Sequence, residues 1–267
     1  MAFANQFISF SFNDDVIENP NLNPWSGSAG NAELKPLEAN QFDLSYENYF
    51  AEDGYFAASF YYKDLTNWHR EGITVADFSQ FYIPGYHDSS NGIAPQNMLG
   101  GITFREDGLE GFIRGREFQA NVPLRLAHDS LEGLGIVASA TFIDGQFDDG
   151  SPVPGLSRES YAITAYYEKN GFEVRISGTK RNGFETETRG LSLSLVPATD
   201  LGAELWDAQI GYNFDESDIE WLHGLRITLQ GQNLTDEKNV QANADSRQIT
   251  QFASFGANYL LGLNYTF

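Results

Sequence analysis

The last eleven residues of the chain alternate between apolar side chains and mostly small or polar ones. The apolar series comprises Ala257, Tyr259, Leu261, Leu263, Tyr265 and Phe267, and the other series comprises Asn258, Leu260, Gly262, Asn264 and Thr266. A period of two predicts a β-strand with one apolar face, Leu260 being the exception. Eleven residues let a tilted strand cross a bilayer. Because an apolar edge strand is an aggregation hazard in water, this stretch predicts a transmembrane strand.

The composition agrees with a β-sheet in a membrane and limits the classes of partner that the chain can bind. No run of eighteen apolar residues exists, which excludes a transmembrane helix, and the mean hydropathy of -0.36 is compatible with strands whose apolar half is hidden in an alternation. The formal net charge of -21 argues against nucleic acid as a partner. Cysteine is absent, so we expect neither disulfides nor a thiolate metal site. Met1-Ala-Phe-Ala lacks the features of a secretory signal, so we expect a mature chain or a piece of a longer one.

About ten alternating stretches occur, and the links between them are alternately long and short. We expect strands near residues 3–12, 41–50, 55–68, 109–122, 134–142, 161–167, 172–177, 206–214, 225–230 and 257–267. Ala51-Glu-Asp-Gly54 and Lys169-Asn-Gly171 are hairpin turns. Long loops are expected at 13–40, from about 67 to 108, at 144–157, after 177 and at 234–256.

This pattern predicts an all-β protein, an antiparallel transmembrane β-barrel with short periplasmic turns and long outer loops. The polar side chains that alternate with the apolar ones favour a wet or plugged lumen over a dry core. A soluble carbohydrate-binding sandwich would also alternate, but its strands are usually shorter, about five or six residues.

Three stretches resemble the TonB-dependent receptors, which are energised outer-membrane transporters. The first is Gly30-Asn-Ala-Glu-Leu-Lys-Pro36, which departs from the family's pattern at Ala32 and Leu37; the second is Val153-Pro-Gly-Leu-Ser157 with Tyr166-Tyr-Glu-Lys-Asn-Gly-Phe172; the third is Gly231-Gln-Asn-Leu-Thr-Asp236 with Leu263-Asn-Tyr-Thr-Phe267. By this resemblance, Gly262, Tyr265 and Phe267 are expected to form the signal read by the barrel-assembly machinery.

The resemblance implies a bacterial outer-membrane protein, since members combine a 22-strand barrel with a plug domain and a TonB box. Residues 1–267 are expected to be the carboxy-terminal portion of such a barrel, without plug domain and TonB box. The implied function is uptake of a scarce nutrient, a siderophore, vitamin or oligosaccharide, without catalysis and without a cofactor. The implied partners are outer-membrane lipid, the TonB system through the missing plug, and a small-molecule or oligosaccharide ligand. A self-contained ten-strand outer-membrane barrel, as a protease or lipase, is the alternative.

The aromatic stretch 67–97 is the candidate ligand site. Aromatic faces beside amide and acid groups suit a sugar or another uncharged or cationic ligand, and the candidates are Trp68, Tyr82, Tyr86 and His87. An interfacial aromatic girdle has the same composition, so that interpretation stays open.

No catalytic or metal site is expected. A protease would need a histidine with an acid within hydrogen-bond reach, and adjacency in His87-Asp88 or His128-Asp129 does not supply that geometry. The acidic loop from Asp144 to Gly150 lacks the ligand spacing of a calcium loop, so we expect a solvated loop and no metal.

Overall fold

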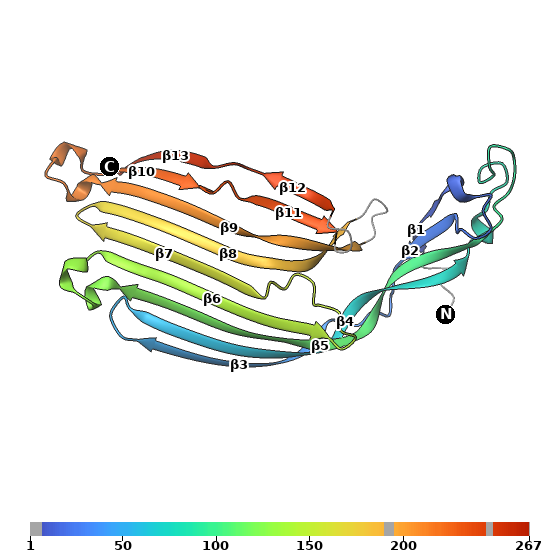
Figure 1. Ribbon diagram of the computed structural model, residues 1–267, viewed down its shortest axis with the longest axis horizontal. Coiled ribbons are helices and arrows are strands. Elements are labelled where there is room, and N and C mark those ends of the chain that lie inside the picture. Colours follow the sequence, from blue (N-terminus) through green and yellow to red (C-terminus); the bar gives the residue numbers. More distant parts are fainter. Residues whose placement is uncertain (1–6, 190–194, 244–247, 267) are drawn as a thin grey trace. The chain divides into compact units, whose positions relative to one another are not determined.

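The computed structural model describes residues 7–189, 195–243 and 248–266, and nearly all of their regular structure is β (Figure 1). The strands are β1 (Phe7–Phe12), β2 (Trp25–Ala29), β3 (Glu38–Tyr49), β4 (Tyr55–Asp77), β5 (Leu99–Pro123), β6 (Leu134–Phe147), β7 (Glu159–Lys169), β8 (Phe172–Arg189), β9 (Leu195–Asn213), β10 (Leu225–Gln232), β11 (Lys238–Asn243), β12 (Ile249–Ser254) and β13 (Asn258–Tyr265). This described part of the chain also has six three-residue 3-10 helices, at Asp14–Val16, Ser79–Phe81, Leu124–Leu126, Asp129–Leu131, Phe214–Glu216 and Glu220–Leu222. None of the described helices has the length and apolarity to cross a membrane.

The chain forms two compact units. Unit 1 comprises the described residues up to Asn40 together with Leu65–Gly111, and unit 2 comprises Gln41–Asp64 together with the described residues from Phe112 onward. The long strands β4 and β5 supply residues to both units.

Unit 2 is a sheet in the order β3-β4-β5-β6-β7-β8-β9-β10-β13, with β11 pairing with β9 and β12 (Figure 1). The pairs from β6 to β13 are antiparallel. Leu229 lies opposite Ile210 on one side and Leu261 on the other, whereas Gln230 lies opposite Gln209. Opposed residues of antiparallel strands point to the same face, so this register separates an apolar face from a polar face.

The apolar face carries the side chains that the alternation predicted. From β6 to β13 the register places on it Ile136, Ala138, Ala140, Phe142, Tyr161, Ile163, Ala165, Tyr167, Phe172, Val174, Ile176, Trp206, Ala208, Ile210, Tyr212, Leu225, Ile227, Leu229, Tyr259, Leu261, Leu263 and Tyr265. Many of them are exposed; Leu261 and Leu263 are 70% and 69% exposed. An apolar surface this extended on a soluble protein would promote aggregation, so it requires a lipid environment.

The sheet of unit 2 does not close on itself. In the part of the chain that the structure describes, β3 pairs only with β4, and β13 pairs only with β10. The alternative of a self-contained ten-strand barrel therefore disagrees with the structure, because such a barrel needs its first and last strands to pair.

The described residues form thirteen strands where the sequence predicted about ten. All five expected loops are partly strand. β2 lies within 13–40, β4 continues through Trp68 to Asp77, and β5 begins at Leu99. β6 runs to Phe147, β8 and β9 extend into the stretch after 177, and β11 and β12 occupy much of 234–256. Beyond the apolar band, water reaches both faces of a strand, so no apolar alternation marks it in the sequence.

Unit 1 contains β1, β2 and the distal parts of β4 and β5. Its packed core consists of Trp25, Ala29, Phe78 and Ile102, bordered by Phe12, Ala76, Phe81, Tyr82, Met98 and Phe104. The pairing of β2 with β5 is parallel, with Trp25 opposite Gly100 and Ser28 opposite Thr103. The sequence predicted a loop at 13–40, so this pair was not expected; a long connection allows it, since parallel neighbours need a crossover rather than a tight turn.

Candidate functional site

Three of the four predicted ligand residues meet in one aromatic cluster of unit 1. The ring centroid of His87 lies 4.8 Å from that of Tyr86 and 6.4 Å from that of Tyr82. Phe12 and Trp25 also pack on the imidazole, at 4.8 and 4.9 Å. We call these five residues the aromatic cluster. His87 is only 4% exposed, so four aromatic rings separate its imidazole from water.

The loop that carries the cluster is closed by its own polar groups. The Tyr82 hydroxyl donates to Oδ1 of Asp88 at 2.5 Å, and the Gly85 amide donates to Oδ2 at 2.7 Å. These hydrogen bonds hold the pKa of the Asp88 carboxyl below its ordinary value, and the bond to Asp88 raises the pKa of Tyr82. The Ile83 amide donates to Nδ1 of His87 at 3.0 Å, which fixes the ring.

The four predicted residues differ in accessibility and in position. Tyr86 is 77% exposed, so its ring is the part of the cluster that a ligand from solvent would meet first. Trp68 lies within β4, nine residues before Asp77, and a strand rise of about 3.3 Å per residue places it about 30 Å back along the strand. The structure therefore separates Trp68 from the end of β4 that leads into the aromatic cluster.

The polar face of unit 2 carries ion pairs near the short turns between strands. Arg175 Nη2 lies 2.5 Å from Glu168 Oε1, and Arg226 pairs with Glu173. Glu173 and Arg175 alternate with the apolar residues of the strand predicted near 172–177, but the alternation could not show these pairs, because a pair depends on the register between strands. A cross-strand pair of this kind contributes at most about 1 kcal/mol at an exposed site.

A cavity of about 630 Å³ lies at the same end of the sheet. Its polar lining includes Asp53, Asn121, Arg125, Tyr166, Glu168 and Arg175. Arg125 pairs with Asp53, so the cavity holds both signs of charge. Such a wall suits a polar surface with its own mixed charges rather than an apolar ligand.

The first family-like motif is a turn that polar side chains of β4 and β5 hold in place. Both carboxylate oxygens of Asp107 accept from the Lys35 amide at 3.1 Å. Asn67 Nδ2 donates to the Pro36 carbonyl at 2.8 Å, and Asn31 Nδ2 donates to the Arg105 carbonyl at 3.0 Å. Asp107 and Asn67 thus satisfy backbone groups of an irregular segment, and Asn31 attaches that segment to β5, which is a structural role.

The second motif attaches the acidic loop between β6 and β7 to strand β8. The buried Ser157 hydroxyl donates to the Asn182 carbonyl at 2.7 Å, and the Gly155 amide donates to the Glu185 carbonyl at 2.8 Å. Asp144, where the sequence predicted the loop to start, lies within β6 and pairs with Arg114 at 2.6 Å. The described residues contain no group of three or more potential metal ligands.

The third motif centres on Asn233, which follows β10. Its backbone has a positive φ of 51°, a conformation that asparagine tolerates better than most residues. Its Nδ2 donates to the carbonyls of Glu237 at 3.1 Å and Gly256 at 3.2 Å, while its Oδ1 accepts from the Glu237 amide at 2.7 Å. Asn233 thus joins the two ends of the segment that contains β11 and β12.

Two residues of the predicted assembly signal lie on opposite faces of β13. Tyr265 is on the apolar face, opposite Leu225, and is 49% exposed. Gly262 lies opposite Thr228, and a Cβ there would lie 2.5 Å from the threonine hydroxyl. Phe267, the third residue of the signal, is outside the described residues.

The histidines considered for a protease have other hydrogen-bond partners. Nδ1 of His128 accepts from the Ser130 amide at 3.1 Å, and Nδ1 of His87 accepts from Ile83. Neither arrangement orients a ring toward the adjacent aspartate as a catalytic base requires.

Taken together, an uncovered apolar face, an ion-paired polar face and strands long enough to cross a bilayer define the wall of a membrane β-barrel. The chain belongs to the TonB-dependent receptors, because residues 3–234 match the family model "TonB dependent receptor-like, beta-barrel". This is a family of outer-membrane transport receptors of Gram-negative bacteria, as the motif resemblance implied.

Solved structures agree on the fold. The siderophore receptor PirA from Acinetobacter baumannii matches with a TM-score of 0.61 and 16% identity over 93% of this chain and 34% of its own. FpvA from Pseudomonas aeruginosa, bound to pyoverdine, matches with a TM-score of 0.56 and 12% identity, over 88% of this chain and 30% of its own. A chain of the FpvAI–pyocin S2 complex matches with a TM-score of 0.57 and 10% identity, over 87% of this chain and 27% of its own. The chain thus spans about a third of the length of these receptors. No curated protein matches it.

Proposed function

We propose that residues 1–267 form the carboxy-terminal part of a receptor barrel that takes up a scarce nutrient across the outer membrane, energised through TonB. The family match over residues 3–234 carries this proposal. The apolar face supplies the contact with outer-membrane lipid, and the ion-paired polar face supplies the wall that a plug domain contacts. The chain acts by binding and positioning, not by catalysis.

Among the nutrients, a siderophore is the first candidate, with a vitamin or an oligosaccharide as the others. Two of the similar structures are described as a siderophore receptor and as a receptor bound to pyoverdine, which supports the choice of the first assay. We further propose that the ligand contacts the aromatic cluster through Tyr86, with Trp68, Tyr82 and His87 as the other candidates. An exposed tyrosine stacks well on planar or ring-shaped ligands.

An uptake assay tests the proposal. A receptor-deleted strain is complemented with a full-length receptor that joins residues 1–267 to a plug domain and a TonB box, and is given radiolabelled iron-siderophore complexes, vitamins or oligosaccharides. Uptake of one ligand class that disappears in a TonB-deficient strain is the expected result, and residues 1–267 expressed alone should give no TonB-dependent uptake. Uptake by the full-length receptor that persists without TonB, or no uptake of any class by it, contradicts the proposal.

A pair of variants tests the ligand contact. Tyr86→Ala should weaken binding by about tenfold to a hundredfold, as removal of an exposed aromatic anchor does. Trp221→Ala is the matched control, because Trp221 is 79% exposed in the short connection between β9 and β10. Equal affinities of the two variants would remove Tyr86 from the site while leaving the transport assignment intact.

Assembly has a separate test. We propose that Gly262, Tyr265 and Phe267 are recognised by the barrel-assembly machinery. Deleting Phe267 should lower the amount of receptor in the outer membrane, whereas changing Thr266 to Ser should not.

A further inference from the structure

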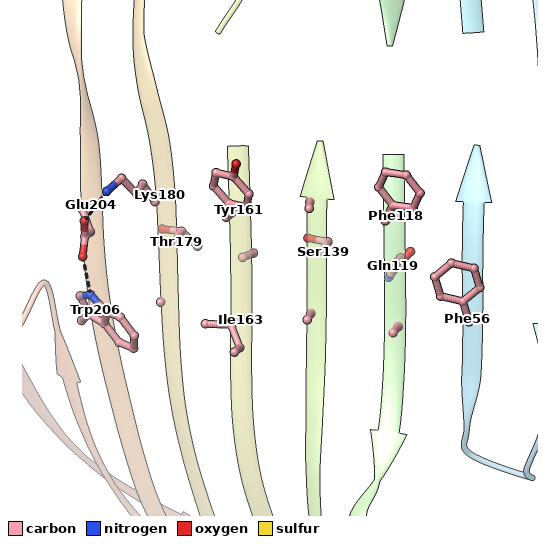
Figure 2. Close-up of a pocket in the computed structure, with 15 residues that line it drawn as sticks. Phe56, Phe118, Gln119, Ser139, Tyr161, Ile163, Thr179, Lys180, Glu204 and Trp206 are labelled. Atoms are coloured by element: carbon pink, nitrogen blue, oxygen red, sulfur yellow. Dashed lines mark hydrogen bonds and ion pairs between the residues drawn. The ribbon is translucent and has the colours of Figure 1, made fainter. Parts of the chain in front are cut away.

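The exposed apolar side chains of unit 1 need a different account from those of unit 2. In unit 2, Phe118, Tyr161 and Ile163 line a cavity of about 520 Å³ on the apolar face that meets lipid (Figure 2). In unit 1, Ile73 and Val75 are 71% and 63% exposed although both lie within strand β4. Two neighbouring β-branched side chains on one face of a strand normally pack against another element.

Strand β4 is an edge strand of the sheet in unit 1, where the order is β1-β2-β5-β4. The Phe78 amide donates to the Met98 carbonyl at 2.8 Å, and Arg70 pairs with Glu106 at 2.7 Å. These two contacts are eight residues apart on each strand, as a regular antiparallel register of β4 and β5 requires. Strand β3 has 12 residues against 23 in β4, and the short turn between them aligns β3 with the first half of β4. Within the described residues, the second half of β4 therefore has a strand neighbour on one side only.

This register leaves backbone groups unpaired along Glu71–Asp77, which we call the β4 edge. In an antiparallel ladder, every second residue bonds to the same neighbour. Because Phe78 bonds to β5, the even-numbered residues of the edge do so too, whereas the amides and carbonyls of Glu71, Ile73 and Val75 point away from β5. No described strand pairs with these groups. Such an edge is a template for a further strand, and this one contains neither proline nor lysine to prevent the pairing.

The side chains of the β4 edge define what an added strand must carry. Ile73, Val75 and Asp77 share one face of β4, because side chains alternate along a strand. The register sets Leu99 opposite Asp77, so β5 places no cation across from this carboxylate. An added strand therefore needs two apolar side chains, two residues apart, and a basic one two residues before them. The formal net charge of -21 also favours a basic partner.

We propose that the β4 edge binds an extended segment of a separate, basic protein as an added antiparallel strand. The segment pairs with the free amides and carbonyls of the edge, packs its apolar side chains on Ile73 and Val75, and sets its basic side chain against Asp77. A second copy of the chain fits less well, because opposing Ile73 of one copy to Val75 of the other also opposes Glu71 to Asp77, which are both acidic. The proposal does not depend on which nutrient is transported.

Residue-resolved hydrogen exchange tests the proposal. A full-length receptor that contains residues 1–267 is purified in detergent and mixed with the probe peptide Lys-Thr-Val-Thr-Ile-Thr-Ser, which has the required pattern. At about ten times the Kd of the peptide, exchange of the Ile73 and Val75 amides should slow about tenfold. Exchange of the Thr74 and Ala76 amides, which already bond to β5, should not change. The same peptide N-methylated at its valine and isoleucine cannot pair with the edge and should have no effect.

Three variants of the receptor separate the contributions to binding. Val75→Pro removes one edge amide without breaking the ladder to β5 and should weaken peptide binding about twofold to tenfold. Val75→Thr keeps the amide and the β-branched shape and is the matched control. Asp77→Asn should weaken binding about twofold to fivefold, but not the binding of a peptide with glutamine in place of lysine. Heat-modifiable migration on gels verifies that each variant is folded.

The other outcomes overturn the proposal. Exchange of the Ile73 and Val75 amides that the peptide leaves unchanged means that the edge accepts no strand. Slow exchange of these amides without peptide, at every receptor concentration, means that another loop of the receptor occupies the edge. Slow exchange that depends on receptor concentration means that a second copy occupies it.

Discussion

Replacing Asn233 should destabilise the segment of β11 and β12. Asn233→Ala removes three side-chain hydrogen bonds to Glu237 and Gly256. At about 1 kcal/mol each, their loss costs about 3 kcal/mol. Alanine at a φ of 51° adds about 1 kcal/mol of backbone strain. The total of about 4 kcal/mol raises the local opening constant about a thousandfold.

Two further variants separate the contributions to this total. Asn233→Gly removes the hydrogen bonds but tolerates the positive φ, so it should raise the opening constant only about a hundredfold. Asn170 has almost the same φ, 52°, and its side chain makes no hydrogen bond with the described residues. Asn170→Ala should therefore cost only the strain, about 1 kcal/mol, or about fivefold in its own hairpin.

Hydrogen exchange followed by mass spectrometry measures these effects. The Leu234 amide donates to the Trp206 carbonyl at 2.8 Å, and the Glu237 amide donates to Asn233, so a peptide over residues 231–240 reports the opening. Exchange should accelerate in the order wild type, Asn233→Gly, Asn233→Ala. If Asn233→Ala exchanges no faster than the wild type, or if Asn233→Gly exchanges faster than Asn233→Ala, Asn233 does not hold the two ends of this segment together.

Three other predictions follow from the faces and loops. Leu229→Lys places a charge on the apolar face and, for a residue near the bilayer midplane, should lower the free energy of unfolding by about 2–4 kcal/mol, as measured by urea unfolding in the presence of lipid. Thr228→Lys, on the polar face, should leave that free energy nearly unchanged. The pKa of Asp88 is lower in the folded loop than its ordinary value of 3.8, so the ionised carboxylate stabilises the loop fully above pH 3.8, and this stabilisation is lost as the pH falls through the lowered pKa. Hydrogen exchange of the Gly85 amide should therefore accelerate in that acidic range. Tyr82→Phe removes one of the two hydrogen bonds to Asp88 and should weaken this pH dependence. Ser157→Ala leaves the Asn182 carbonyl without its donor and should expose the loop after β6 to proteolysis at a cost of about 1 kcal/mol.

The two faces of the sheet could be predicted from sequence alone. The alternation around Ile227 and Leu229, and around Leu261 and Leu263, gave the apolar face that the register confirms. Strand ends could not be predicted where both faces meet water. The stretch of β4 beyond Asn67 lacks a continuous apolar series, so it was interpreted as a loop.

The candidate site was predictable in part. Composition singled out Tyr82, Tyr86 and His87, which the structure brings together, and their role in ligand binding stays a prediction. Trp68 was predicted to belong to the same site because no alternation of apolar and polar residues shows that β4 continues past it to Asp77. The contact of the Trp206 ring with Gly178 was not predictable, because it depends on which strands become neighbours: the two residues are 28 positions apart in the chain and opposite in the sheet.

The parallel pairing of β2 with β5 has a consequence for the order in which unit 1 forms. Gly27 lies opposite Ile102, 75 residues later in the chain, and both belong to strands that contribute to the core around Trp25. Trp25 therefore stays unburied until the residues after Leu99 have emerged and returned, and closing so long a loop is slow compared with forming a hairpin. The hairpins of unit 2 can form one after another as the chain arrives, whereas unit 1 must wait. A chaperone that shields apolar segments during export would be needed longest by residues 25–29.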